Sequence, residues 1–169
     1  MDNLQPRSSD AQTHPEFDGR WKRLTLQANA AFNAGQLEAA GVAYDQALHE
    51  ARMIFAEAWH GHAAVQPHAP PMLIVSATNA ANQRRASGHE KAATEQLMSA
   101  IRIFTEALTS ARSPESLKRG CAEHLPRLLA ELTPPHSETE SIIEEAKSAA
   151  LAYWKTSANC TCPKKGNTI

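Results

Sequence analysis

Apolar residues recur at intervals of three and four along most of the chain, which is the spacing of one face of an α-helix. The pattern predicts six helices, and they cover residues 14–34, 36–59, 71–87, 89–112, 114–132 and 137–156. The strongest strand candidate is the β-branched cluster MLIVSAT (72–78), but it continues into NAAN at helical spacing, so we interpret it as helix. The fold class predicted from this pattern is all-α.

The apolar stripes also predict which side chains face the core. In the helix expected at 36–59 these are Leu37, Ala40, Tyr44, Ala47, Leu48, Ala51, Ile54, Phe55 and Ala58, and in that at 89–112 they are Ala93, Leu97, Ala100, Ile101, Phe104 and Leu108. In the last helix we expect Leu151 to face inward, and Tyr153 and Trp154 to seal the core.

Turn and capping residues mark where these helices begin and end. The T-x-x-E spacing at 13–16 and the S-x-x-E spacing at 137–140 are typical of helix N-termini. Gly35 and Gly88 follow the first and third helices, where a residue that tolerates positive φ is expected. Pro126 lies inside the fifth helix and should kink or divide it.

The chain is long enough for one domain with its own core, which we place at residues 14–156. Polar segments flank this domain at residues 1–13 and 157–169, and we expect both to be flexible. Much of the apolar content is alanine, and aromatic residues make up only 5% of the chain. This composition favours closely packed helices over a β-sandwich.

An internal echo, a set of matching residues 53 positions apart, relates the first two helix pairs. When Gly35 is placed on Gly88, small and polar positions coincide: Thr25 with Thr78, Ala28 with Ala81, Asn29 with Asn82, Ala40 with Ala93 and Ala47 with Ala100. Small residues at such positions let two antiparallel helices approach closely. One hairpin cannot bury both of its faces, so about three must stack to be stable.

The echoed positions resemble the tetratricopeptide (TPR) family, whose repeat is a helical hairpin of about 34 residues. The small, glycine, alanine and large apolar positions of that repeat are matched here by Ala28, Gly35, Ala40, Tyr44 and Ala47, and in the second copy by Ala81, Gly88, Ala93, Leu97 and Ala100. The two copies are 53 residues apart, and the third helix pair has no glycine in its turn. The resemblance implies antiparallel helical hairpins stacked as a short TPR-like array of about six helices.

The same resemblance implies a groove for a partner, lined by the first helix of each pair. Carried over to this sequence, its partner-binding positions are Lys22, Thr25, Asn29, Phe32, Asn33, Val75, Thr78, Asn82 and Arg85. An asparagine amide can donate and accept, which suits an extended peptide backbone. The alternative is that Asn29 and Asn82 bridge neighbouring helices. Threonine occupies the position at which carboxylate-binding TPR domains carry lysine, which argues against a carboxylate clamp.

The function predicted on this basis is that of a non-catalytic adaptor or scaffold that binds a peptide or helix of another protein. Self-association into a homo-oligomer is an alternative use of the same groove. The nucleotide-binding and nucleophile-elbow glycine motifs are absent from the sequence, so we do not expect an enzyme. No cofactor is implied.

A metal-binding or metal-responsive helical protein is the alternative function. His60, His62 and His68 lie in one connection, and Cys160 and Cys162 lie close together near the end of the chain. Imidazole and thiolate groups at such spacing can share a transition metal. Against this, the histidines are equally typical of a solvated loop, and no C-x-x-C pair is present. Cys121 is expected to be a core residue.

The charge balance excludes some partners. The formal net charge is −1, which gives no general attraction to nucleic acid or to an anionic membrane. No apolar run approaches the roughly 18 residues of a membrane span, and the N-terminal residues contain no apolar signal region. Three cysteines, an odd number, argue against a disulfide framework. We therefore expect a cytoplasmic protein.

Overall fold

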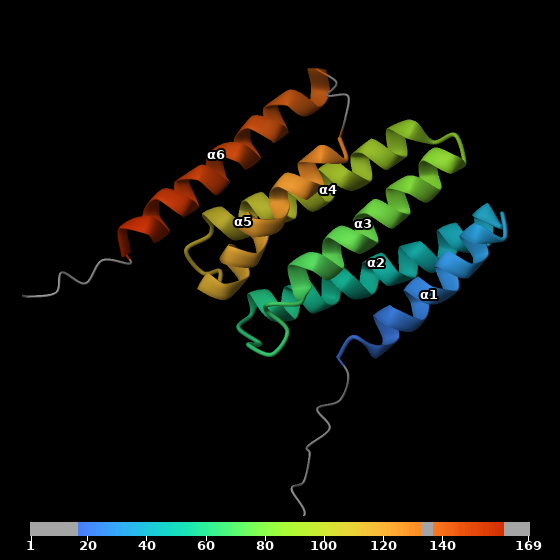
Figure 1. Cartoon of the computed structure of the whole chain (residues 1–169), viewed down its shortest axis with the longest axis horizontal. Helices are drawn as coiled ribbons and strands as arrows, with labels where there is room; N and C mark the ends of the chain where they lie inside the picture. Colours follow the sequence, from blue (N-terminus) through green and yellow to red (C-terminus); the bar gives the residue numbers. More distant parts are fainter. Residues whose placement is uncertain (1–16, 133–136, 161–169) are drawn as a thin grey trace, which may run out of the picture.

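The computed structural model describes residues 17–132 and 137–160, which form six α-helices and no strand. The helices are α1 (Gly19–Asn33), α2 (Leu37–Trp59), α3 (Ala69–Ala86), α4 (Glu90–Thr109), α5 (Glu115–Ala130) and α6 (Ser137–Cys160). They lie side by side, with α1 at one end of the molecule and α6 at the other (Figure 1). The prediction of an all-α fold is confirmed, and MLIVSAT lies within α3 as expected.

Most predicted helix boundaries agree with the structure to within a few residues. Helix α1 begins at Gly19, later than expected, and the T-x-x-E spacing at 13–16 lies outside the described residues. Helix α6 continues through Cys160, so its predicted end at residue 156 was too early. Of the two outcomes predicted at Pro126, a kink or a division of α5, the division is wrong, because the helix runs through the proline without interruption. Leu125 and Leu128 on either side of this proline are buried, and their packing opposes the break.

The two glycine turns have the same backbone hydrogen bonds. Gly35 and Gly88 have φ values of +73° and +78°, which side chains rarely tolerate. Gln36 N donates to Ala31 O at 2.9 Å, and His89 N donates to the equivalent Arg84 O at 2.8 Å. These bonds satisfy carbonyl groups at the ends of α1 and α3 and reverse the chain into α2 and α4. The internal echo is therefore a repeat of structure at these turns.

The core is built from the apolar faces that the sequence pattern predicts. The predicted inward positions of α4 are all buried: Ala93, Leu97, Ala100, Ile101, Phe104 and Leu108. Those of α2 are buried too, apart from the half-buried Leu37 at its start. Phe55 of α2 stacks on Phe104 of α4, with 5.8 Å between the ring centroids. The alanines allow the helix axes to approach, and the large side chains fill the remaining space.

Helix α3 lies against both helices of the first pair. Trp21 Nε1 of α1 donates to Ser76 Oγ at 2.7 Å, and Gln83 Nε2 donates to the backbone oxygen of Leu37 in α2, also at 2.7 Å. Gly41 makes the second contact possible, because a Cβ atom there would lie 2.9 Å from Gln83 Nε2. Helix α3 is thus fixed by a polar contact to each of its predecessors.

Helix α5 repeats this placement one pair later, in contact with both α3 and α4. Gly120 of α5 lies beside Pro70 of α3, where a Cβ atom would be 2.9 Å from the proline ring. A glycine therefore lies at a close helix contact on each side of α3.

Helix α6 departs from the tight hairpins of the first two pairs, because it packs more extensively against α4 than against α5. Its buried face carries Ala146, Ala149 and Tyr153. Tyr153 is buried as expected, whereas the predictions that Leu151 faces the core and that Trp154 helps to seal it were wrong. These two side chains are out of step with the buried positions and are 60% and 42% exposed.

None of the described helices combines the length and apolarity that crossing a membrane requires.

Candidate docking groove

A groove of about 480 Å³ separates α5 from α6. It is lined by four residues of each helix: Ala122, Leu125, Pro126 and Leu129 of α5, and Lys147, Ala150, Leu151 and Trp154 of α6. We call it the α5/α6 groove. Its volume lies within the range of roughly 300–1,000 Å³ that is usual for ligand sites, and all but one of its lining residues are apolar.

The sequence builds both walls of the groove with the same spacing. The lining residues of α5 and those of α6 each follow the positions i, i+3, i+4 and i+7. These positions form one face of a helix over two turns. Seven residues at 1.5 Å each make a wall of about 10 Å. The walls are therefore equal in length and long enough for two turns of an added helix.

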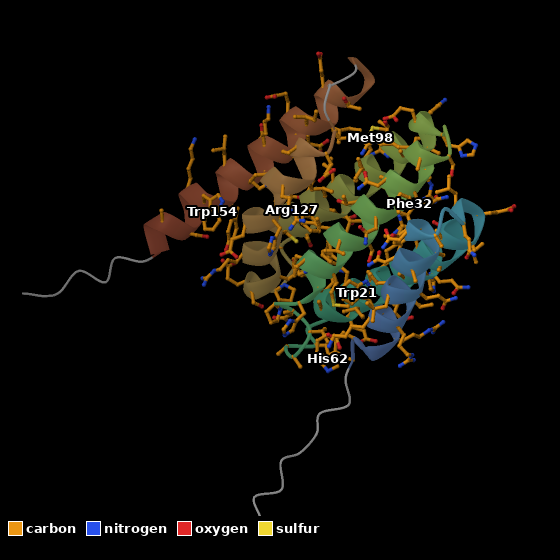
Figure 2. All side chains as sticks on the ribbon, turned by 45° about the vertical axis from the view of Figure 1, so that its right-hand side comes forward. Trp21, Phe32, His62, Met98, Arg127 and Trp154 are labelled. Carbon is orange, nitrogen blue, oxygen red and sulfur yellow. The ribbon has the colours of Figure 1, made fainter. Side chains whose placement is uncertain are left out.

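The α6 wall leaves large apolar side chains in contact with solvent. Leu125 of α5 is buried at the base, whereas Leu151 and Trp154 stand exposed on the other side. The rings of Tyr153 and Trp154 meet edge to face at 5.1 Å, and this contact positions the indole. Trp154 lies at the end of the molecule away from α1 (Figure 2). Exposed apolar surface that gathers at a groove is typical of an interaction site.

Charge plays little part in the groove. Lys147 is the single charged residue among those that line it, and its Nζ lies 2.8 Å from Glu144 Oε1. Both side chains are exposed, so this ion pair contributes little to stability. The surface is suited to recognition by apolar contact and shape.

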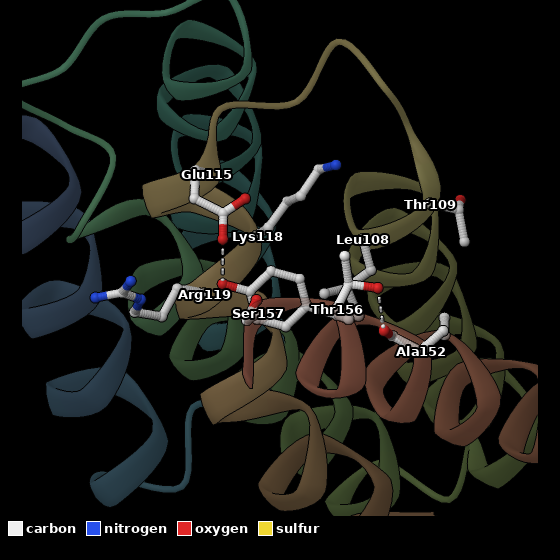
Figure 3. A pocket seen from close by; sticks show the side chains of 10 residues that line it. Leu108, Thr109, Glu115, Lys118, Arg119, Ala152, Thr156 and Ser157 are labelled. Carbon is white, nitrogen blue, oxygen red and sulfur yellow. Dashed lines mark hydrogen bonds between the residues drawn. The ribbon is translucent and has the colours of Figure 1, made fainter. Parts of the chain in front are cut away.

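A second, more polar cavity of about 630 Å³ lies where α4, α5 and α6 meet (Figure 3). Within it the Tyr153 hydroxyl donates to Glu115 Oε1 at 2.7 Å, which ties the C-terminal half of α6 to the first turn of α5. Lys118 and Arg119 lie on either side of this bond. The buried Tyr153 ring and its hydrogen bond hold α6 in place and oppose its closing over the α5/α6 groove.

Several of the predicted partner-binding residues of α1 already contact other residues of this chain. Asn29 Oδ1 accepts a hydrogen bond from the Tyr44 hydroxyl at 2.7 Å. Phe32 packs edge-on against the same tyrosine, with 6.2 Å between the ring centroids. The Thr25 hydroxyl oxygen is buried and has no hydrogen-bond partner among the described residues. Lys22 pairs with Asp18 at 3.0 Å.

The predicted residues of α3 are arranged differently. Asn82 is exposed and accepts from Arg85 Nη1 at 3.2 Å, while Arg85 Nη2 donates to the backbone oxygen of Glu131 at 2.9 Å. The Thr78 hydroxyl is buried like that of Thr25, and Val75 is half-buried. Neither threonine hydroxyl can therefore meet a partner at this surface.

Asn29 and Asn82, which occupy equivalent positions in the two copies, thus have different roles. Asn29 bridges α1 and α2 through Tyr44, as the structural alternative anticipated for that residue. Asn82 makes no such bond, because the residue equivalent to Tyr44 is Leu97, which has no hydroxyl. Among the predicted residues, Lys22, Asn33 and Asn82 are the exposed ones.

The loop histidines do not converge. His60, His62 and His68 are all exposed, and His62 Nδ1 lies 3.4 Å from Glu57 Oε2. The His68 ring instead lies 5.4 Å from that of Phe17. No group of three histidine, cysteine or acidic residues that could hold a metal occurs in the part of the chain that the structure describes. The Cys160 side chain and Cys162 lie outside that part.

Cys121 is fully buried, as predicted, and burial raises the pKa of its thiol.

The family model described as "Protein of unknown function (DUF2753)" matches residues 19–161. The chain belongs to the DUF2753 family. The match begins with α1 and includes all of α6, so the α5/α6 groove lies inside the region that defines the family. No curated protein and no solved structure matches the chain. The family description names no activity, so the chemistry of the groove must indicate the function.

Sequence reasoning missed this groove, although a signal for it was present. Leu151 and Trp154 are three residues apart and do not fall in phase with Ala146, Ala149 and Tyr153. Two apolar faces on one helix predict two packing surfaces, of which the other described residues cover one.

Proposed function

We propose that this DUF2753 protein is a non-catalytic protein-interaction module, and that it binds a segment of another protein in the α5/α6 groove. The observation that carries the proposal is the exposure of Leu151 and Trp154 beside a preformed apolar groove at one end of the helical array. Tryptophan is enriched among the residues that dominate binding energy at protein interfaces. Helix pairs that contact each other in succession also support a TPR-like scaffold.

The proposal keeps the adaptor function expected from the sequence but moves its main surface from the α1 and α3 face to α5 and α6. Both threonine hydroxyls among the predicted contacts are buried, and the Asn29 amide oxygen already has a donor in Tyr44. Lys22, Asn33 and Asn82 remain predicted contacts on that face.

Site-specific photo-cross-linking tests the proposal. A benzophenone amino acid replaces Leu151 in one variant and Met53 of α2, which is 51% exposed, in a matched control. Both are exposed apolar positions, so non-specific hydrophobic capture affects them equally. We expect cross-links to another protein from position 151 that are absent from position 53 and that disappear when Trp154→Glu is added.

Two outcomes would contradict the proposal. The first is the same set of cross-linked proteins from both positions. The second is cross-linking at position 151 that Trp154→Glu leaves unchanged, because contact with the groove requires both apolar side chains.

A further inference from the structure

Each of the first two helix pairs is followed by a helix that packs against both of its members. Helix α3 does so on the α1/α2 pair, and α5 does so on the α3/α4 pair. Helix α3 lies against α1 through Trp21 and Ser76, and against α2 through Gln83 and the backbone of Leu37. Helix α5 likewise contacts both members of the preceding pair, and its contact with α3 is closer than that of α3 with α1. In both cases a single helix covers both members of the preceding pair.

The third pair has the same position, and no helix of the described residues covers it. The α5/α6 groove is lined by residues of both helices in equal number, as a site for a helix lying against both requires. Its walls extend over two turns, about 10 Å. A helix that places large apolar side chains at i, i+3 or i+4, and i+7 presents them over the same length. The dimensions of the groove therefore match one face of an amphipathic helix.

Within the part of the chain that the structure describes, α1 to α5 do not offer such a face on their exposed sides. Their exposed large apolar residues are Leu26 of α1, and Val42 and Met53 of α2. Val42 and Met53 are three turns apart, so none of these residues has a second one within the span of the groove. Among the described residues of a second copy, Leu151 and Trp154 of α6 would be the exposed apolar pair at the right spacing, but α6 is held by its own α4 and α5 and forms a wall of its own groove, so it cannot enter this groove as a separate helix.

We infer that the occupant of the α5/α6 groove is an amphipathic α-helix of another protein, seated as the next helix of the array. This inference rests on the proposed function and specifies the partner's chemistry: a helix with apolar residues on one face over at least two turns. Because the groove carries a single lysine that is already paired with Glu144, the contact depends on apolar burial.

Binding of two synthetic peptides to the full chain tests the inference. Both peptides have the same composition and are labelled with fluorescein. One places leucines at i, i+3 and i+7 over about four turns of helix, and the other alternates the same leucines with polar residues, a strand-like period. Fluorescence anisotropy gives the two affinities. Leu151→Glu blocks the groove at an exposed position that the fold does not need, and Met53→Glu is the matched control.

We expect the helical-period peptide to bind about tenfold more tightly than its isomer, and Leu151→Glu to remove that preference while Met53→Glu leaves it. The helical-period peptide should also gain helical circular dichroism on binding. Equal affinities, no binding of either peptide, or a preference that survives Leu151→Glu would each overturn the inference. So would a dimer of this chain that Leu151→Glu dissolves, because the occupant would then be a second copy.

These results separate the inference from the proposed function. If specific cross-links at position 151 persist while the peptides show no preference for helical period, the interaction module stands and the helical partner does not. If position 151 gives no specific cross-links, the interaction module itself is refuted.

Discussion

The Tyr44 hydroxyl of α2 donates a hydrogen bond to Asn29 Oδ1 of α1 at 2.7 Å, and replacing Asn29 by alanine removes this acceptor. Tyr44 is only 5% exposed, but its bond to the half-buried Asn29 is partly buried, so water can replace the lost acceptor in part. A neutral hydrogen bond contributes about 1 kcal/mol net, and a buried donor left unpaired costs about 1–3 kcal/mol. We therefore expect Asn29→Ala to lower the free energy of unfolding by about 1–2 kcal/mol.

The internal echo supplies the control. Asn82 occupies the equivalent position in α3, but it is exposed and bonds only to Arg85 of its own helix. Substitutions at such surface positions usually change stability by less than about 0.5 kcal/mol. Urea unfolding followed by circular dichroism should show a clear loss for Asn29→Ala and little change for Asn82→Ala.

A double-mutant cycle with Tyr44→Phe isolates the hydrogen bond itself. Residues in direct contact give coupling energies of about 0.5–3 kcal/mol, and we expect about 1 kcal/mol for this pair. Equal losses for Asn29→Ala and Asn82→Ala, or zero coupling between positions 29 and 44, would refute the assignment of Asn29 to the fold.

The pH dependence gives an independent check on Tyr44. Burial raises the pKa of its phenol in the folded protein. As the pH rises above about 10, the phenol of the unfolded chain loses its proton first. The folded state then binds more protons, so the free energy of unfolding falls with rising pH, while below this range Tyr44 contributes no slope. Tyr44→Phe should make the decline above this pH smaller.

Three further predictions concern the core and the groove. Gly41→Ala should not give the stabilisation of roughly 1 kcal/mol that alanine usually has over glycine inside a helix, because its Cβ atom would lie 2.9 Å from Gln83 Nε2 and displace that donor from Leu37 O. A gain of that size in urea unfolding would show that the contact is not needed. Cys121 is buried, so in a variant whose other two cysteines are replaced by serine it should react with a disulfide reagent only when urea unfolds the chain. Rapid reaction of the folded protein would contradict its place in the core. Leu151→Glu should leave the free energy of unfolding within about 0.5 kcal/mol of the wild type, because this side chain is already 60% exposed; a large loss would mean that it packs in the core.

Much of the fold could be predicted from the sequence because it depends on local order. The spacing of apolar residues fixed the inward faces of α2 and α4, since a helix places every third or fourth side chain on one side whatever surrounds it. The turns at Gly35 and Gly88 were predictable for the same reason, because a positive φ restricts the residue type at that single position.

Whether the predicted contact residues meet a partner or another part of the fold could not be predicted, because the sequence of one helix face does not determine what covers it. Asn29 and Asn82 share a sequence context, yet one meets Tyr44 and the other solvent. The difference comes from position 97, where leucine replaces the tyrosine of the first copy. Whether Thr25 and Thr78 present their hydroxyls to a partner also depended on how α1 and α3 sit against their neighbours.

The sequence by itself determined where the helices form, which faces of the first two pairs are apolar, and where the chain reverses. Only the tertiary structure decided that α6 leans on α4 rather than closing over α5, so that Leu151 and Trp154 face a groove instead of a core. Helix formation and turn geometry depend on residues a few positions apart. The placement of α6 depends on the balance of its contacts with two helices distant in the sequence, and no short-range pattern encodes that balance.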